Sequence, residues 1–125
     1  MNEGKIVISD RYADATFAYQ GAGRGFSEEK VNQIIELATD GLKPDLTLFF
    51  DITVATAVER SSSRDESHAK KNRMDEESAE FYTRVRDAYL GIADREPERF
   101  KVIDANGSVN DIHWAVMRVV EEFLR

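Results

Sequence analysis

The sequence predicts an α/β fold in which short parallel strands alternate with helices. Three short apolar runs each end in or next to an aspartate: KIVIS at 5–9, LTLFF at 46–50 and FKVI at 100–103. Amphipathic segments separate these runs, a pattern typical of a parallel sheet flanked by helices. Because the carboxyl ends of the strands form the ligand site in such sheets, we expect a site near these aspartates.

The bulk composition indicates one globular domain, or a piece of one. The 125 residues are 42% hydrophobic and 33% charged, with a formal net charge of −7 and no cysteine. The negative charge argues against nucleic-acid or anionic-membrane partners, and the lack of cysteine excludes disulfides and thiolate metal sites. No apolar run approaches the length of about 18 residues that a membrane span needs. We therefore expect a cytoplasmic protein that binds small phosphate compounds through a few local cations.

The first half of the chain carries two predicted helices joined by a glycine-rich loop. Asp14 caps a short helix that stops at Gly21, and the loop GAGRG covers residues 21–25. Ser27 caps the second helix, and Gly41 ends it. Apolar residues at helical spacing predict the buried stripe of the second helix: Val31, Ile34, Ile35 and Ala38.

The second half of the chain is predicted to contain three helices and one irregular segment. Thr53 caps the first helix, the long second helix begins near Asp75, and Ser108 or Asn110 caps the last. The stripes of the last two helices are Phe81, Val85, Ala88, Tyr89 and Ile92, and Ile112, Val116, Val119, Val120 and Phe123. Residues 61–73, SSSRDESHAKKNR, contain a single apolar residue, so we predict a mobile surface segment or a lid there.

The residues that follow the first apolar run offer groups suited to a nucleotide. Arg11 emerges where the run ends, and a guanidinium can hold a phosphate through paired hydrogen bonds. Asp10 could orient this arginine or help to hold a metal-bound water. Thr16, Tyr19 and Gln20 share a helical face at i, i+3 and i+4, and their polar groups suit a sugar hydroxyl and the polar edge of a pyrimidine. The alternative is a surface Asp-Arg pair beside a Tyr19 that packs in the core with its hydroxyl in water.

The predicted lid is rich in cations, which lie within it or directly beside it: Arg60, Arg64, Lys70, Lys71 and Arg73. Phosphoryl transfer spreads negative charge over the equatorial oxygens, and arginines on a closing loop stabilise that charge. A charge cluster alone more often indicates a solvated surface loop, and this interpretation stays open. Neither His68 nor His113 has partners at a spacing that predicts a metal site.

Taken together, six segments in order resemble the bacterial thymidylate kinase family: DRY, AYQGAGRG, LKPDLTLFFD, NRMDEES, RVRDAYL and VIDA. The resemblance implies a P-loop nucleoside monophosphate kinase fold, a parallel sheet with helices on both faces. It implies transfer of the γ-phosphoryl group of ATP to dTMP with Mg²⁺, and a homodimer. A deoxynucleoside kinase of the same fold and a non-catalytic nucleotide-binding or interaction module remain as alternatives.

The resemblance implies roles for the residues on the dTMP side. Arg11 would bind the dTMP phosphate, with Asp10 close to it and to the metal region. Thr16 would lie at the thymine ring, Tyr19 would contact the deoxyribose, and Gln20 would line the same pocket. Asp10 could touch the metal only through water.

The resemblance also implies roles on the ATP side and in the lid. Arg60 would stack on adenine at the base of the lid. Arg64 and Arg73 would face the transferring phosphoryl group and act with Arg11 as catalytic residues. The residues expected near the adenine are those that follow VID: Ala105, Asn106 and Gly107.

The resemblance covers only the C-terminal portion of the family. Nothing in the chain matches G-x-x-x-x-G-K-[ST], the loop whose backbone N–H groups hold the ATP phosphates, and GAGRG lacks its lysine. In the family, the strand before that loop lies between the strands that match KIVIS and LTLFF. We therefore expect residues 1–125 to be the C-terminal part of a single domain with an incomplete sheet. Such a chain would not be a competent kinase alone, and the N-terminal half could act in trans.

Overall fold

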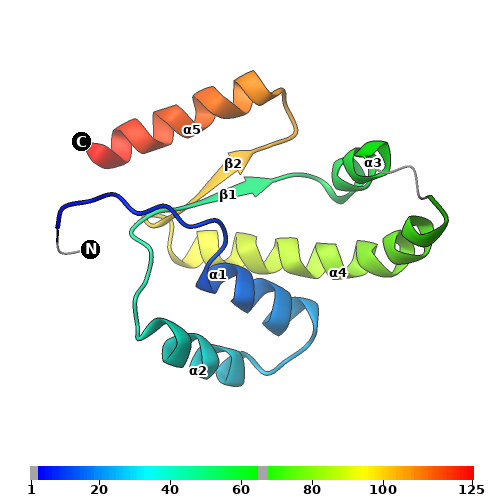
Figure 1. The fold of residues 1–125 in the computed structure, drawn as a ribbon, viewed down its shortest axis with the longest axis horizontal. Helices are drawn as coiled ribbons and strands as arrows, with labels where there is room; N and C mark the ends of the chain where they lie inside the picture. Colours follow the sequence, from blue (N-terminus) through cyan, green and yellow to red (C-terminus); the bar gives the residue numbers. More distant parts are fainter. Residues whose placement is uncertain (1–2, 65–67) are drawn as a thin grey trace. The chain divides into compact units, whose positions relative to one another are not determined.

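The computed structural model describes residues 3–64 and 68–125, without the side chains of Val58, 61–64 and 68–78. The elements are α1 (Ala13–Thr16), the π-helix η1 (Phe17–Gly23), α2 (Glu28–Thr39), β1 (Thr47–Asp51), α3 (Val54–Arg64), α4 (His68–Arg95), β2 (Phe100–Asp104) and α5 (Val109–Leu124) (Figure 1). The chain divides into two compact units, Met1–Lys43 and Pro44–Arg125. None of the described helices is long and apolar enough to cross a membrane.

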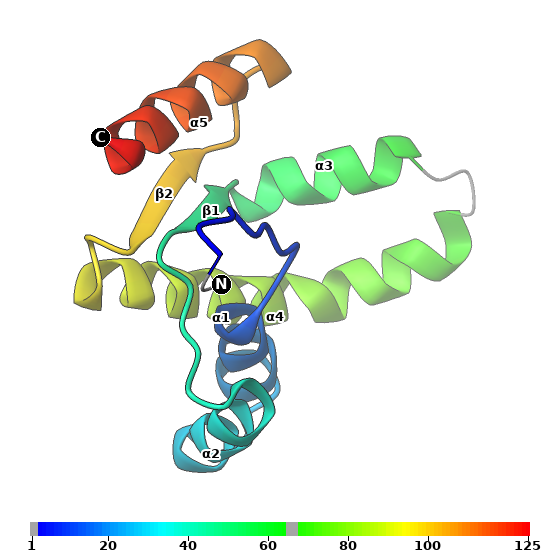
Figure 2. The same ribbon diagram turned by 60° about the vertical axis from the view of Figure 1, so that its left-hand side comes forward.

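The second unit contains a two-stranded parallel sheet with helices on both faces. β1 and β2 pair in register, from Thr47 opposite Phe100 to Asp51 opposite Asp104. Both α4 and α5 contact β2, and Figure 1 and Figure 2 show the sheet between these two helices. This arrangement confirms the predicted α/β class with a short parallel sheet and flanking helices.

The core of the second unit is built mainly between the sheet and α4. Four side chains from α4 and β2 are buried there: Val85, Ile92, Phe100 and Ile103. The rings of Phe49 and Tyr89 stack with centroids 4.5 Å apart, and such a pair contributes about 0.5–1.5 kcal/mol beyond its buried area. In contrast, α5 has no fully buried residue. The sheet is therefore covered more completely by α4 than by α5.

Hydrogen bonds at the helix ends confirm two of the four predicted caps. Asp14 is not a cap, because α1 begins at Ala13 after the N-cap Tyr12 and Asp14 lies in its first turn. Thr53 Oγ1 accepts from the backbone N–H of Thr56 at 3.1 Å, at the start of α3. Ser108 Oγ accepts from the Asp111 N–H at 3.1 Å, and the Asp111 carboxylate accepts from the Ser108 N–H at 3.3 Å. This reciprocal pair is a capping box, so Ser108 caps α5 and Asn110 does not. Ser27 precedes α2 as predicted, although its side chain makes no capping hydrogen bond.

The strand predicted at residues 5–9 is wrong. These residues have no regular structure, and Ile6, Val7 and Ile8 are 75%, 68% and 91% exposed. A strand is stable only when its backbone N–H and C=O groups pair with a neighbouring strand. Within 3–64 and 68–125, the sheet consists of β1 and β2 alone. The apolar pattern identified a segment suited to a strand, but the described residues supply no partner for it.

The helix predicted over residues 14–21 is present, but much of it is a π-helix. After one α-helical turn, the π-helix η1 extends to Gly23, the second glycine of the predicted loop. A π-helix has i→i+5 hydrogen bonds, and the Arg24 N–H donates to the Tyr19 carbonyl at 3.0 Å in this pattern. Gly21 is buried against α2, where an added Cβ would lie 3.9 Å from Val31 Cγ2. The wider turn thus packs a small residue against α2.

The stripe predicted for α2 is only partly buried. Val31 is 4% exposed and Ile35 is half-buried, whereas Ile34 is 62% exposed and Ala38 is exposed. Within its unit, α2 contacts the short α1 and η1. Because these two short helices cover less of α2 than a full core would, the stripe is narrower than helical periodicity predicts.

Most of the lid predicted at residues 61–73 belongs to helices, and its role as a lid stays a prediction. α3 extends to Arg64 and α4 begins at His68, well before the predicted start near Asp75. Residues 65–67 lie outside the described part of the chain. The apolar stripe located the buried part of α4, but the helix continues where the stripe stops. Lysine, arginine and alanine have good helix propensity, which favours a helix in this polar segment.

Candidate functional site

Arg11 has an unusual backbone conformation, with a φ of 65°. The left-handed region costs an L-residue roughly 1–2 kcal/mol, and residues held there cluster at functional sites. Ser9 Oγ donates to the Arg11 carbonyl at 3.2 Å, which supports the turn. The Arg11 guanidinium carbon lies 4.5 Å from the centroid of the Tyr19 ring. This turn therefore places Arg11, the residue predicted to bind the dTMP phosphate, against η1.

Of the five residues predicted on the dTMP side, Arg11 and Tyr19 are in contact. Thr16 is the last residue of α1 and is exposed, while Gln20 is exposed on η1. Asp10 is an exposed residue of the turn that precedes α1. The common face of Thr16, Tyr19 and Gln20 was derived from α-helical spacing, which the π-helical turns do not keep. Their shared pocket therefore stays a prediction.

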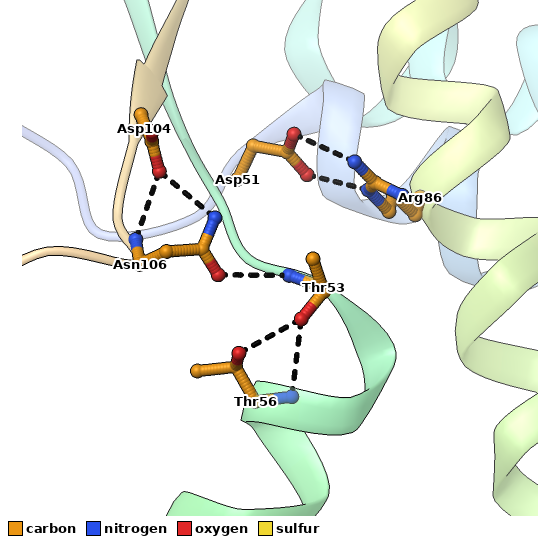
Figure 3. Close-up of polar contacts among 6 residues, drawn as sticks. All are labelled: Asp51, Thr53, Thr56, Arg86, Asp104 and Asn106. Carbon is orange, nitrogen blue, oxygen red and sulfur yellow. Dashed lines mark hydrogen bonds and ion pairs between the residues drawn. The ribbon is translucent and has the colours of Figure 1, made fainter.

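The carboxyl ends of β1 and β2 carry a network of polar contacts (Figure 3). On one side, Asp51 accepts two hydrogen bonds from Arg86 of α4: Nε to Oδ1 at 2.7 Å and Nη2 to Oδ2 at 3.0 Å. The Asp51 side chain is 15% exposed and the Arg86 side chain 37%. The hydrogen bonds to Asp51, and then its negative charge, raise the pKa of Arg86 above its ordinary value. This bidentate pair ties the end of β1 to α4.

On the other side, Asn106 connects the end of β2 to the start of α3 (Figure 3). Asp104 Oδ1 accepts from the Asn106 backbone N–H at 3.0 Å and from its Nδ2 at 2.8 Å. Asn106 Oδ1 in turn accepts from the Thr53 N–H at 3.2 Å. The backbone hydrogen bond from Asn106, followed by the side-chain one, lowers the pKa of Asp104 below its ordinary value. Asp104 therefore stays ionised at neutral pH and holds the loop that follows β2.

Arg60 of α3 reaches the same loop. Its Nη2 donates to the carbonyls of Asn106 and Gly107 at 3.3 and 3.4 Å. Ala105 is 5% exposed, and its N–H donates to the Asp51 carbonyl at 2.9 Å. The residues predicted on the ATP side, Arg60 and 105–107, thus lie together at the carboxyl ends of the strands. Both polar atoms of the Asn106 amide are used within the protein. Contact of these residues with ATP stays a prediction.

The predicted lid arginines, Arg64 and Arg73, fall where the structure does not describe side chains. Their backbones belong to the end of α3 and the start of α4. Their catalytic role, like that of Arg11, stays a prediction.

Sequence analysis did not single out Arg86, or the hydrogen bond between Thr53 and Asn106. Asp51 was recognised only as the end of a strand. A partly buried aspartate needs a cation or several donors, and Arg86 directly follows the buried Val85 on α4. The position of Arg86 beside the apolar stripe of α4 is therefore the sequence signal for a contact near the core. This signal does not identify the strand that Arg86 contacts.

The resemblance implies magnesium together with ATP. The described residues offer few side chains that could bind this ion. These residues contain no group of three or more His, Asp or Glu side chains that could hold a metal ion. Asp51 and Asp104 are engaged by Arg86 and Asn106. Mg²⁺ usually takes one or two carboxylates and completes its shell with substrate phosphates and water. Asp10 fits only as one such carboxylate, so this part of the chain does not form a metal centre by itself.

A solved structure shares this fold. The crystal structure titled as thymidylate kinase from Ehrlichia chaffeensis superposes with a TM-score of 0.65 and 32% sequence identity. The match covers 96% of this chain and 51% of that one. The chain, with the short parallel sheet of its second unit, therefore corresponds to about half of an α/β nucleotide kinase.

Sequence comparisons specify which kinase family this is. The family profile described as thymidylate kinase matches residues 1–116, so the chain belongs to the thymidylate kinase family. A relative named thymidylate kinase from Pelobacter propionicus is 43% identical over 122 residues, which are 96% of this chain and 56% of the relative. Another from Cupriavidus necator is 43% identical over 120 residues, 96% of this chain and 57% of the relative. The chain thus spans little more than half the length of these curated relatives.

Proposed function

We propose that the protein to which this chain belongs transfers the γ-phosphoryl group of ATP to dTMP, giving dTDP, with Mg²⁺ bound to the nucleotide. The observation that carries this proposal is the family match over residues 1–116. Relatives that carry the name thymidylate kinase are 43% identical. ATP and dTMP are accordingly the proposed ligands, and a homodimer is the proposed assembly.

On the dTMP side, Arg11 is proposed to bind the phosphate. Its guanidinium has a planar set of donors that matches phosphate oxygens. The left-handed turn and the contact with Tyr19 support this role, because they restrict where the guanidinium can point. Thr16, Tyr19 and Gln20 are proposed to surround the nucleoside, with Asp10 near the metal-bound water.

On the ATP side, Arg60 is proposed to stack on the adenine. Its hydrogen bonds to the carbonyls of Asn106 and Gly107 fix the edge of the guanidinium. Stacking uses the face, so the same group can hold the loop and contact a base. Arg64 and Arg73 are proposed to stabilise the charge on the transferring phosphoryl group.

Substrate preference tests this proposal. Residues 1–125 are combined with the part of the Pelobacter propionicus relative that lies outside the matched region, and then incubated with ATP, Mg²⁺ and either dTMP or thymidine. We expect phosphorylation of dTMP and not of thymidine. Phosphorylation of thymidine alone would replace the proposal with a deoxynucleoside kinase. Absence of turnover with both substrates, in a folded sample, would favour a non-catalytic nucleotide-binding module.

A further inference from the structure

Tyr19 is the partner of Arg11 in the first unit. The guanidinium carbon of Arg11 lies over the Tyr19 ring at 4.5 Å from its centroid, within the range of about 6 Å for a cation–π contact. The two residues come from separate segments, since Arg11 precedes α1 and Tyr19 lies in η1. The contact therefore closes the turn of residues 9–12 onto η1.

The ring of Tyr19 is carried by a well-anchored segment. Ala18 and Gly21, on either side of Tyr19 in η1, are buried, and α2 packs against η1. The Tyr19 carbonyl accepts from the Arg24 N–H at 3.0 Å, a bond of the π-helical type. Tyr19 itself is half-buried and is carried by this anchored segment.

The backbone of Arg11 is also constrained, independently of Tyr19. Its φ of 65° is a conformation that L-residues rarely adopt, and Ser9 Oγ donates to its carbonyl at 3.2 Å. A guanidinium offers all of its N–H donors in one plane, while its faces carry none. Stacking on a ring therefore restricts the plane of the group and uses no donor.

We propose that Tyr19 is a positioning residue, whose ring face holds the Arg11 guanidinium in the orientation that receives the phosphate of a nucleoside monophosphate. This role rests on the proposed function and adds to it, because the resemblance implies only a contact between Tyr19 and the sugar. The two roles differ in what they predict. A sugar contact acts on dTMP and thymidine alike, whereas positioning of Arg11 acts on the ligand that carries a phosphate.

The test compares the affinities of dTMP and thymidine for the 125-residue chain and for two variants, by calorimetric titration. Tyr19→Leu removes the π face, and Tyr19→Phe keeps it and removes the hydroxyl. In Tyr19→Leu we expect the ratio of dTMP affinity to thymidine affinity to fall about two- to fivefold, the range for an exposed cation–π contact. In Tyr19→Phe we expect the ratio of dTMP affinity to thymidine affinity to equal that of the unchanged chain. An equal loss for both ligands, or the same fall of the ratio in both variants, would overturn the proposal.

A spectroscopic readout separates failure of this role from failure of the proposed function. If the unchanged chain binds neither ligand, the proposed function fails for this chain, and the side-chain resonances of Arg11 decide the positioning role. Ring currents should shift the Arg11 Hδ and Hε resonances upfield in the unchanged chain and in Tyr19→Phe, but not in Tyr19→Leu. Identical Arg11 resonances in all three proteins would show that the ring does not hold the guanidinium.

Discussion

At the scale of single residues, the most informative side chains are two arginines in different surroundings. Arg11 is exposed, lies in a left-handed turn and stacks on Tyr19. Arg86 is half-buried and donates two hydrogen bonds to Asp51. The exposed Arg11 is suited to binding a ligand, whereas Arg86 joins α4 to β1.

Arg11→Ala should weaken the binding of dTMP more than that of thymidine. The guanidinium is proposed to bind the phosphate group, which thymidine lacks. A hydrogen bond between charged groups is worth roughly 1.5–3 kcal/mol. The expected loss for dTMP is thus about tenfold or more, measured by calorimetric titration of both ligands. Arg118→Ala, which removes an exposed arginine of α5, is the control for the loss of charge. Equal weakening of dTMP and thymidine in Arg11→Ala would contradict a phosphate role.

Arg86→Ala should destabilise the second unit. It leaves the Asp51 carboxylate, 15% exposed, without its bidentate partner. We expect a loss of about 1–2 kcal/mol in the free energy of unfolding, near the low end for charged hydrogen bonds because solvent screens the 37% exposed arginine. Urea unfolding measures this change. Arg95→Ala, at an exposed position of the same helix, should change the stability by no more than about 0.5 kcal/mol. Equal stability of the two variants would show that the pair contributes nothing.

At the scale of the elements, the loop after β2 is fixed by Asn106. Its side chain joins Asp104, at the end of β2, to the Thr53 N–H at the start of α3. The backbone carbonyls of Asn106 and Gly107 accept hydrogen bonds from Arg60 Nη2. Asn106 therefore joins β2 to α3 beside the proposed adenine site, through its side-chain amide and its backbone carbonyl.

Asn106→Ala should raise the pKa of Asp104 toward its ordinary value, because the side-chain hydrogen bond that helps to lower it is removed. A lowered pKa in the folded state adds stability at pH values above the ordinary aspartate pKa of about 3.9. That contribution is lost as the pH falls through the lowered value. The stability difference between the two proteins should therefore be present at pH 7 and narrow below about pH 4. An NMR titration of the Asp104 carboxyl carbon measures the pKa directly, and the same pKa in both proteins would contradict this account.

Sequence patterns predicted both strands of the described sheet and most of the helices, but they also predicted a strand that the structure does not contain. Caps and periodicity located α2, α3, α5 and the buried half of α4. Residues 5–9 have the composition of a strand but form none, since pairing requires a neighbour that composition does not reveal. The π-helix was not predicted, because apolar periodicity indicates α-helical spacing, which π-helical turns do not keep. At the candidate site, the resemblance predicted Arg60 and 105–107, which the structure brings together, whereas no sequence pattern predicted the contact of Asp51 with Arg86.

At the scale of the whole molecule, much apolar surface is exposed. In the described part of the chain, the sheet has two strands of five residues each, and two-stranded sheets are marginally stable alone. Large exposed side chains occur in both units, among them Ile8, Leu37, Phe50 and Trp114. Extended apolar surface favours association with another chain or aggregation. We therefore expect the purified chain to associate unless another polypeptide covers these surfaces.

The most direct test of the central claim is the yield of dTDP from ATP, Mg²⁺ and dTMP, with and without the segment of the Pelobacter propionicus relative that lies outside the matched region. The chain spans 56% of that relative, and positioning of ATP by backbone N–H groups supplies much of the catalysis in phosphoryl transfer. We expect residues 1–125 to give little or no dTDP alone. With the segment supplied in trans, we expect dTDP to form and the chain to remain monodisperse. Rapid dTDP formation by a monomeric, cooperatively folded 125-residue chain alone, or none with the segment bound, would contradict the account.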